Sequence, residues 1–287
     1  MNLLRHIDRC NRFAPERFLP LWREGTRIGF IRRHDHAPAL ARFPKIFATR
    51  PDGIHLIAQG GFDALSAAVD EVVEALIKEG LIPKWRNEFF AVAGGLGSPP
   101  LLKLDRGAVS FFGTRAYGVH LNGFRRKADK IELWIGRRAA DKKVSPNKLD
   151  NMVAGGIPWG HGILSTLVKE AEEEAGMAAD LTREATFQGF LSYRMEVEGG
   201  ARDDVLYLYD LEVPGDFVPE NRDGEIASFA PMPAEEVIAR VSASEDFKFN
   251  VNLVLIDFAL RHGLVRPDDP DYPRLMSGLH PSLDRAF

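Results

Sequence analysis

Three glutamates near the end of one amphipathic helix constrain this chain more than any other feature of its sequence. Residues 161–175 read as a helix, because apolar side chains recur there at steps of three and four. Glu170, Glu173 and Glu174 share a second face of that helix, and Gly176 follows as a C-terminal stop. The cluster is doubly unfavourable: each like-charge pair costs about 0.2–0.5 kcal/mol, and the helix dipole is already negative at this end.

The acidic cluster has two interpretations. Most runs of glutamate on helices are solvated surface, and on the residues alone that interpretation stays open. A bound divalent cation would remove both penalties, and clustered carboxylate oxygens suit Mg²⁺ or Mn²⁺. The position of the cluster at the negative end of the helix favours the metal site.

A glycine-rich loop precedes the helix and contains Gly155, Gly156 and Gly160. Glycines permit backbone conformations closed to other residues, and they let a ligand approach the main chain closely. Such a loop is a weak signal by itself. Joined to a carboxylate helix, it indicates a functional site.

The loop and helix together resemble the Nudix box, which has the form G-x5-E-x7-R-E-U-x-E-E-x-G-U with U apolar. The matching residues are Gly155, Glu170, Ala171, Glu173, Glu174, Gly176 and Met177. His161 stands in place of the first glutamate of the box, and Lys169 stands in place of the arginine. The resemblance implies a hydrolase that cleaves a phosphoanhydride bond in a small-molecule diphosphate, with the three glutamates holding Mg²⁺ or Mn²⁺.

Other segments resemble one Nudix subfamily, the domain fused to thiamine pyrophosphokinase in some fungi and its plant and bacterial relatives. These segments are Phe111–Phe124, Leu149–Gly156, Asp223–Glu225, Phe247–Asn250 and Leu255–Gly263. The resemblance implies thiamine diphosphate or its oxidised forms as substrates. Nucleoside diphosphate derivatives, such as nucleotide sugars and oxidised nucleotides, are an alternative substrate class. A non-catalytic diphosphate-binding protein with a degenerate box is a second alternative, because His161 departs from the pattern.

Two carboxylates are candidates for the general base, Glu170 and Glu225, and Glu225 is equally well explained as a solvated turn residue. Arg138 follows an expected strand and is a candidate phosphate clamp, although an ordinary loop arginine is the alternative. His120 and Asn122 would hydrogen-bond a ligand or occupy the polar side of a half-buried strand.

Two aromatic residues, Trp159 and Tyr193, are candidates for stacking on a heteroaromatic ring of the substrate. Aromatic side chains are more often part of a core, so that alternative stays open for both.

The pattern of expected strands and helices changes near residues 100–118, after a stretch rich in glycine and proline. We expect a smaller α+β domain at residues 1–115, which shapes the substrate pocket, and the Nudix domain at residues 116–287. Strands alternating with helices in the second part predict an α/β/α sandwich around a mixed sheet. The proline-rich tail beyond residue 265 is expected to be mostly loop.

The composition excludes some classes of partner. The formal net charge is -4, so no strong positive field exists for nucleic acid. No apolar run approaches the roughly 18 residues that a membrane span needs. The single cysteine, Cys10, cannot form an internal disulfide and fits a reducing cytoplasm. Nudix relatives often dimerise, so a homodimer is also an expectation.

Overall fold

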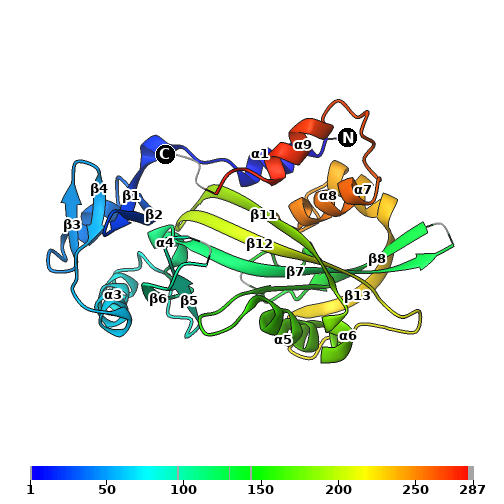
Figure 1. Cartoon of the computed structure of the whole chain (residues 1–287), viewed down its shortest axis with the longest axis horizontal. Helices are drawn as coiled ribbons and strands as arrows, with labels where there is room; N and C mark the ends of the chain where they lie inside the picture. Colours follow the sequence, from blue (N-terminus) through cyan, green and yellow to red (C-terminus); the bar gives the residue numbers. More distant parts are fainter. Residues whose placement is uncertain (1, 96, 129, 143, 284–287) are drawn as a thin grey trace.

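The computed structural model describes residues 2–283 apart from positions 96, 129 and 143. The chain forms two parts, called here the smaller and the larger body, and each is built around its own β-strands (Figure 1). The strands of the smaller one end with Asp105, and those of the larger one begin with Arg115. Within the described ranges, no helix combines the length and the apolar character that a membrane crossing requires.

A four-stranded sheet and a hairpin make up the smaller body. The sheet order is β2-β1-β4-β3, with β1 and β4 parallel and the other neighbours antiparallel. The strands are β1 (Phe18–Arg23), β2 (Thr26–Arg32), β3 (Phe47–Arg50), β4 (Gly53–Leu56), and the hairpin strands β5 (Phe89–Val92) and β6 (Leu102–Asp105). The helical segments are η1 (Pro15–Arg17), α2 (His36–Ala41), α3 (Phe62–Lys78) and α4 (Val109–Phe112).

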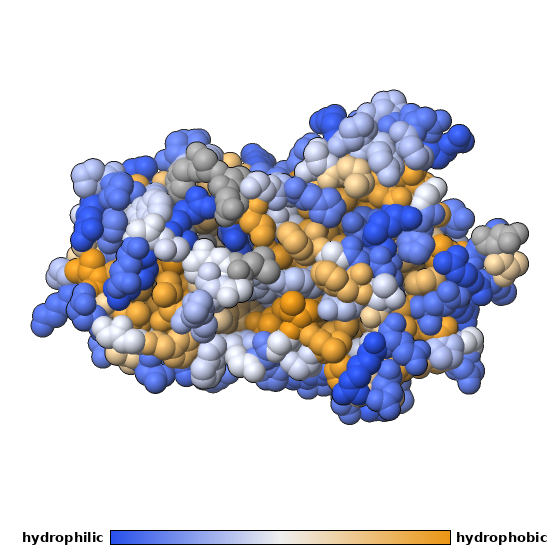
Figure 2. All heavy atoms as spheres, viewed as in Figure 1, coloured by the Kyte–Doolittle hydropathy of each residue, from blue (hydrophilic) through white to orange (hydrophobic). Residues whose placement is uncertain are grey.

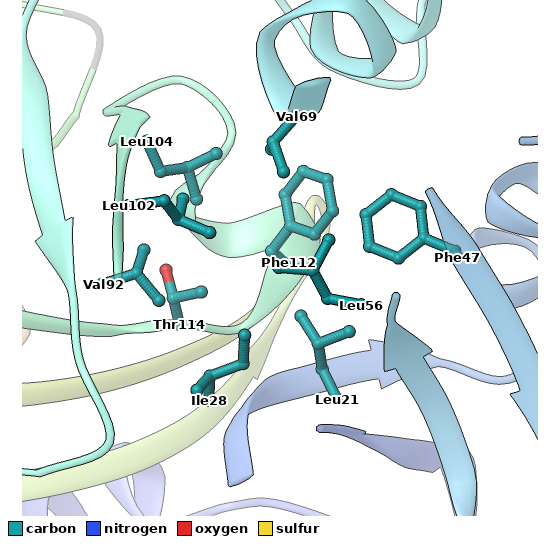
Figure 3. A pocket seen from close by; sticks show the side chains of 10 residues that line it. All are labelled: Leu21, Ile28, Phe47, Leu56, Val69, Val92, Leu102, Leu104, Phe112 and Thr114. Atoms are coloured by element: carbon teal, nitrogen blue, oxygen red, sulfur yellow. The ribbon is translucent and has the colours of Figure 1, made fainter. Parts of the chain in front are cut away.

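The core of this body forms because α3 buries the apolar stripe that its sequence predicts, including Leu65, Val69 and Leu76. Side chains from the sheet, from α3 and from the hairpin point toward one another in Figure 3. They are Leu21, Ile28, Phe47, Leu56, Val69, Val92, Leu102, Leu104, Phe112 and Thr114. The cavity between them measures about 10 Å³, which is at most the room that one water molecule needs.

The larger body is a seven-stranded mixed sheet. The main order is β11-β12-β7-β8-β13, and β7 and β12 run parallel in its middle. The strands are β7 (Arg115–Lys127), β8 (Lys130–Arg138), β9 (Leu149–Asp150), β10 (Val153–Gly156), β11 (Thr186–Val197), β12 (Gly200–Glu212) and β13 (Ile226–Pro233). The pairing of β7 with β8 begins at Phe124, and before that residue β7 pairs with β10 instead.

Helices cover both faces of this sheet (Figure 1). One face carries α5 (Ile163–Ala175) and α6 (Ala179–Arg183). The other face carries α1 (Leu4–Cys10), α7 (Ala234–Ala243), α8 (Val251–Arg261) and α9 (Tyr272–Leu279). Side chains alternate along β7, so that Val119 and Leu121 join the core beneath α5 while Phe124 joins the core beneath α8. The predicted α/β/α sandwich with a mixed sheet, preceded by a smaller α+β part, is confirmed.

Three local expectations differ from the structure. The tail was expected to be loop, but it forms α9, whose Pro273 lies in the first turn where proline is tolerated. Helix α1 packs with the larger body, since Ile7 and Cys10 are buried in the core that includes α8. Helix α5 begins at Ile163, so His161 lies in the loop before it and is exposed.

Candidate active site

Helix α5 ends as its sequence predicts. Gly176 adopts the left-handed conformation with φ 63°; its N–H donates to the carbonyl of Glu172, and the N–H of Met177 donates to the carbonyl of Ala171. The expected apolar face turns toward the sheet through Leu167 and Ala171, but Glu174 is buried beside them. An acidic side chain therefore points into the molecule at the end of the helix.

The Glu174 carboxylate is 3% exposed and accepts a hydrogen bond from the backbone N–H of Ala154 at 2.8 Å. Burial raises the pKa of Glu174 well above its usual value, and the negative charges of Asp150 and Glu170 add to that effect. The Ala154 N–H and the ammonium of Lys248 act in the opposite direction. A cation next to this carboxylate would relieve its desolvation.

The other two glutamates of the cluster share one lysine. Lys169 Nζ lies 3.2 Å from Glu170 Oε1 and 2.5 Å from Glu173 Oε2. Burial raises the pKa of Glu170, and the charges of Glu173 and Glu225 raise it further, while Lys169 lowers it. Lys169 thus supplies a positive charge between two of the three predicted metal ligands.

The predicted metal ligands are not gathered into one finished cluster. Across residues 2–283 without positions 96, 129 and 143, no three histidine, cysteine or acidic side chains form a group that could hold a metal ion. Glu174 points to β10, and Glu173, 44% exposed at its side chain, turns to Lys169. Glu170 precedes both in sequence; it contacts Lys169, and its charge acts on Glu174.

The two glycines of β10 are required for reasons that the sequence did not predict. Both lie in extended backbone and have no left-handed φ, unlike Gly160, whose φ is 88°. A Cβ on Gly155 would overlap the carboxyl group of Glu170. A Cβ on Gly156 would lie 2.7 Å from Cζ of Phe90 on β5. Side chains of two other elements therefore approach the backbone here.

Glu225 lies in the turn before β13 and pairs with Lys142, whose Nζ is 2.5 Å from Glu225 Oε1. Nearby Asp223 accepts a hydrogen bond from the Glu225 N–H at 2.8 Å. Burial raises the pKa of Asp223, and the charges of Glu225 and Glu173 raise it further. The turn therefore brings two more carboxylates toward the acidic end of α5.

Arg138 is committed to internal contacts rather than to a solvent-facing clamp. It is 6% exposed, its Nη1 donates to Asp150 at 2.8 Å, and its Nε and Nη2 donate to the carbonyl of Val144. Lys248 Nζ also reaches Asp150, at 3.4 Å. Asp150 and Lys248 were not predicted as site residues, although both lie in segments that resemble the Nudix subfamily.

His120 and Asn122 also lie inside the protein, 3% and 1% exposed. Asn151 joins them: its Oδ1 is 2.8 Å from His120 Nδ1, and its Nδ2 donates to Asn122 Oδ1 at 2.5 Å. Asn122 donates in turn to Asp210 at 2.9 Å. Burial and the charge of Lys248 lower the pKa of His120 to about 4, so the ring is neutral near pH 7. This network fixes the segment between β9 and β10, and the expected ligand contacts are not exposed to solvent.

The two aromatic candidates have opposite surroundings. Tyr193 is fully buried, and its hydroxyl donates to Asp204 Oδ2 at 2.5 Å, so the core alternative applies to it. Trp159 is 42% exposed and stacks on Phe62 of α3, with ring centroids 5.3 Å apart. An open aromatic group lies instead on β11 and β12, where Phe187 and Tyr209 have centroids 5.4 Å apart.

A cavity of about 120 Å³ lies between β2 and the larger sheet. Arg27, Arg115 and Asp203 line it together with Leu283, and Arg115 pairs with Asp203 at 3.0 Å. None of the predicted site residues lines this cavity, so it is separate from the acidic end of α5.

The sequence is similar to known proteins along most of its length. A NUDIX domain model matches residues 115–251, and a model described as a domain of unknown function, DUF4743, matches residues 2–116. Nudix hydrolase 24, chloroplastic, of Arabidopsis thaliana is 38% identical over 94% of this chain and 75% of its own. Nudix hydrolase 20, chloroplastic, of the same plant is 38% identical over 93% of this chain and 74% of its own. The crystal structure of a C. elegans Ap4A hydrolase in a binary complex has a TM-score of 0.38 at 16% identity, covering 52% of this chain and 99% of that one.

A sandwich of this topology, with a glycine-lined strand against an acidic helix end, defines a class of hydrolases that act on small-molecule diphosphates. The chain belongs to the Nudix hydrolase family and carries the N-terminal DUF4743 domain. It is therefore a pyrophosphohydrolase.

Proposed function

We propose that this enzyme converts thiamine diphosphate, or oxidised forms of it, to the monophosphate with Mg²⁺ or Mn²⁺ as its cofactor. The observation that carries the chemistry is the buried Glu174 carboxylate beside Glu170 at the negative end of α5. The substrate class rests on the resemblance of several segments, spread over both halves of the chain, to the Nudix domain fused to thiamine pyrophosphokinase.

The donor atoms at the end of α5 suit a hard divalent cation, although the three carboxylates are not gathered into one cluster in the described part of the chain. Glu170, Glu173 and Glu174 supply only oxygen donors, which Mg²⁺ and Mn²⁺ prefer. The Lys169 ammonium, 3.2 Å from Glu170 and 2.5 Å from Glu173, already stands where positive charge is favourable. A bound cation would neutralise the diphosphate and polarise the phosphorus–oxygen bond under attack.

The protein residues then orient the water and accept its proton. A water oxygen attacks one phosphorus, the bridging phosphorus–oxygen bond breaks, and the products are the organic monophosphate and inorganic phosphate. Glu170 is the better candidate for the base, because burial raises its pKa and makes it a stronger proton acceptor. The Glu225 carboxylate is 42% exposed and paired with Lys142.

Nucleoside diphosphate derivatives are the second candidate substrates, and one observation favours them. Phe187 and Phe190 are 52% and 38% exposed on β11, beside Tyr207 and Tyr209 of β12. Exposed rings of this kind offer a face on which a purine base stacks.

A hydrolysis screen tests the proposal. Purified enzyme with Mg²⁺ is given thiamine diphosphate, its oxidised forms, nucleotide sugars, dinucleotides and oxidised nucleotides, and monophosphate is measured by chromatography. Glu174→Gln serves as the blank. We expect turnover of the thiamine-type diphosphates that the variant lacks. Turnover of nucleotides alone would overturn the substrate, and no turnover of any compound would favour a binding protein.

A further inference from the structure

The loop between β10 and α5 is held by the smaller body of the protein. The backbone N–H of Trp159 donates to the carbonyl of Phe89 on β5 at 2.7 Å. The Trp159 ring stacks on Phe62 at the start of α3, with an interplanar angle of 24°. Lys103 Nζ of β6 lies 4.9 Å from the Trp159 ring and 4.8 Å from the Phe89 ring. Trp159 thus contacts β5 through its backbone and α3 through its ring. The charge of Lys103 on β6 also lies over that ring.

A second contact lies at the base of the same loop. Phe90 follows Phe89 on β5, and its ring tip fills the space in which Gly156 has no side chain. Any Cβ at that position would come within 2.7 Å of Phe90 Cζ. The β5–β6 hairpin therefore touches β10 one residue after Gly155, which makes room for the Glu170 carboxyl group.

The rest of the loop is open to solvent and is held by backbone hydrogen bonds, from Ile157 N–H to Tyr117 and from His161 N–H to Pro158. Trp159 is 42% exposed, and a Cβ at Gly160 would meet open space. His161 and Gly162 are exposed. The loop nevertheless joins β10, whose Ala154 N–H binds Glu174, to the helix that carries Glu170 and Glu174. A shift of the loop would move both partners of that hydrogen bond relative to each other.

The interior of the smaller body offers no comparable role. Its apolar cavity of about 10 Å³ is too small for any ligand beyond a single water molecule. Its outer surface, in contrast, meets the loop through the rings of Phe62 and Phe90, the Phe89 carbonyl and the Lys103 ammonium group. Figure 1 shows β5, β6 and α3 at the end of the larger sheet that adjoins the start of α5.

We propose that the N-terminal part of this enzyme is a clamp that sets the conformation of the loop before the catalytic helix, with Phe62, Phe90 and Lys103 as positioning residues. The inference rests on the proposed function wherever enzyme activity is the readout. It assigns the N-terminal part to the active-site framework rather than to a separate binding module.

Two substitutions test the clamp, one that creates a steric clash and one that removes it. Gly156→Ala inserts a methyl group against Phe90, and Phe90→Leu removes the ring tip that this methyl meets. We expect Gly156→Ala to lower kcat by about tenfold with a smaller effect on KM, because misplaced groups affect the reacting geometry. In the Phe90→Leu background the same substitution should cost less than about threefold. An equal loss in both backgrounds would overturn the proposal.

Hydrogen exchange gives a readout that does not need a substrate. In intact protein, amide exchange of residues 157–162 should accelerate in Gly156→Ala and in Lys103→Met, and return toward the wild-type rate in the Gly156→Ala, Phe90→Leu double variant. Lys45→Met, which removes an exposed lysine elsewhere in the N-terminal part, is the matched control and should change nothing. Unchanged exchange in Lys103→Met and Gly156→Ala would contradict the clamp. Accelerated exchange in an enzyme inactive on every diphosphate would keep the clamp and reject the proposed function.

Discussion

Gly155 lacks a side chain because of a packing contact and not because of its backbone conformation. It lies in an extended strand, and the carboxyl group of Glu170 occupies the space beside it. The sequence singled out this glycine correctly as part of the loop–helix motif. The neighbour that requires it belongs to a different element and became visible only when β10 and α5 were packed together.

Replacing Gly155 by alanine should displace the Glu170 carboxylate. We expect Gly155→Ala to lower kcat by at least about tenfold, because displacements of about 1 Å reduce catalysis strongly. Gly162→Ala is the control, since a Cβ there would meet only the Ser165 hydroxyl at 3.7 Å. Steady-state kinetics with the substrate found in the screen measures both. Equal activity of Gly155→Ala and wild type would contradict the packing argument.

Tyr193 allows the opposite prediction. Its ring is buried and its hydroxyl donates to Asp204, so it cannot stack on a substrate. Tyr193→Phe should leave kcat/KM unchanged and reduce the free energy of unfolding by about 1–2 kcal/mol, because a buried acceptor loses its donor. Chemical denaturation and kinetics on the same preparation measure both quantities. A selective loss of kcat/KM at unchanged stability would restore the ligand-binding role.

At the scale of elements, α5 was predictable in its extent, its end and its apolar face, but not in the burial of Glu174. Apolar spacing and Gly176 fix a helix that ends at Ala175, and Leu167 and Ala171 of the expected face are buried. Spacing alone places the glutamates on a second face. The Ala154 N–H of β10 accounts for the burial of Glu174 by donating a hydrogen bond to it. Likewise, His120 and Asn122 of β7 were predicted to contact a ligand. In the structure, Asn151 forms hydrogen bonds with both of them inside the protein.

The end of α5 carries its own prediction. Gly176 has φ 63°, and a Cβ there would lie 2.9 Å from the Glu220 carbonyl oxygen. Gly176→Ala should therefore lower the free energy of unfolding by about 1–2 kcal/mol through strain at the left-handed position. Gly215→Ala, in a turn with open space beside the glycine, is the control. A stability equal to wild type for Gly176→Ala would contradict the described helix end.

At the scale of the whole molecule, the sequence indicated a change in the pattern of elements near residues 100–118. It also indicated an α+β part before this change and a sandwich with a mixed sheet after it. It did not indicate the contacts between distant segments. Helix α1 lies far from α9 in sequence, but Ile7 occupies the space beside Gly278, 2.5 Å from where a Cβ would be. The loop at Trp159 depends in the same way on Phe89. No local pattern encodes such pairings, because they arise from the packing of complete elements.

Two buried histidines predict how the stability of the whole fold depends on pH. Burial and the charge of Arg32 lower the pKa of His36 to about 4, and burial and Lys248 lower that of His120 to about 4. Between pH 6.5 and 4 the unfolded chain binds protons on these rings that the folded chain does not. The free energy of unfolding should therefore rise with pH in this window and fall on acidification.

Denaturation at several pH values measures that slope. His36→Gln should reduce it by up to one proton, which is about 1.4 kcal/mol per pH unit at most. An unchanged slope in His36→Gln would show that this ring is protonated equally in both states.

The most direct test of the account concerns the carboxylates at the end of α5. Calorimetric titration of Mn²⁺ into wild type, Glu174→Gln and Glu172→Gln compares a buried glutamate with a neighbour whose side chain is 64% exposed. We predict that wild type and Glu172→Gln bind the ion alike, and that Glu174→Gln binds it at least about tenfold more weakly. Equal affinity in Glu174→Gln and wild type would contradict the assignment of the metal site.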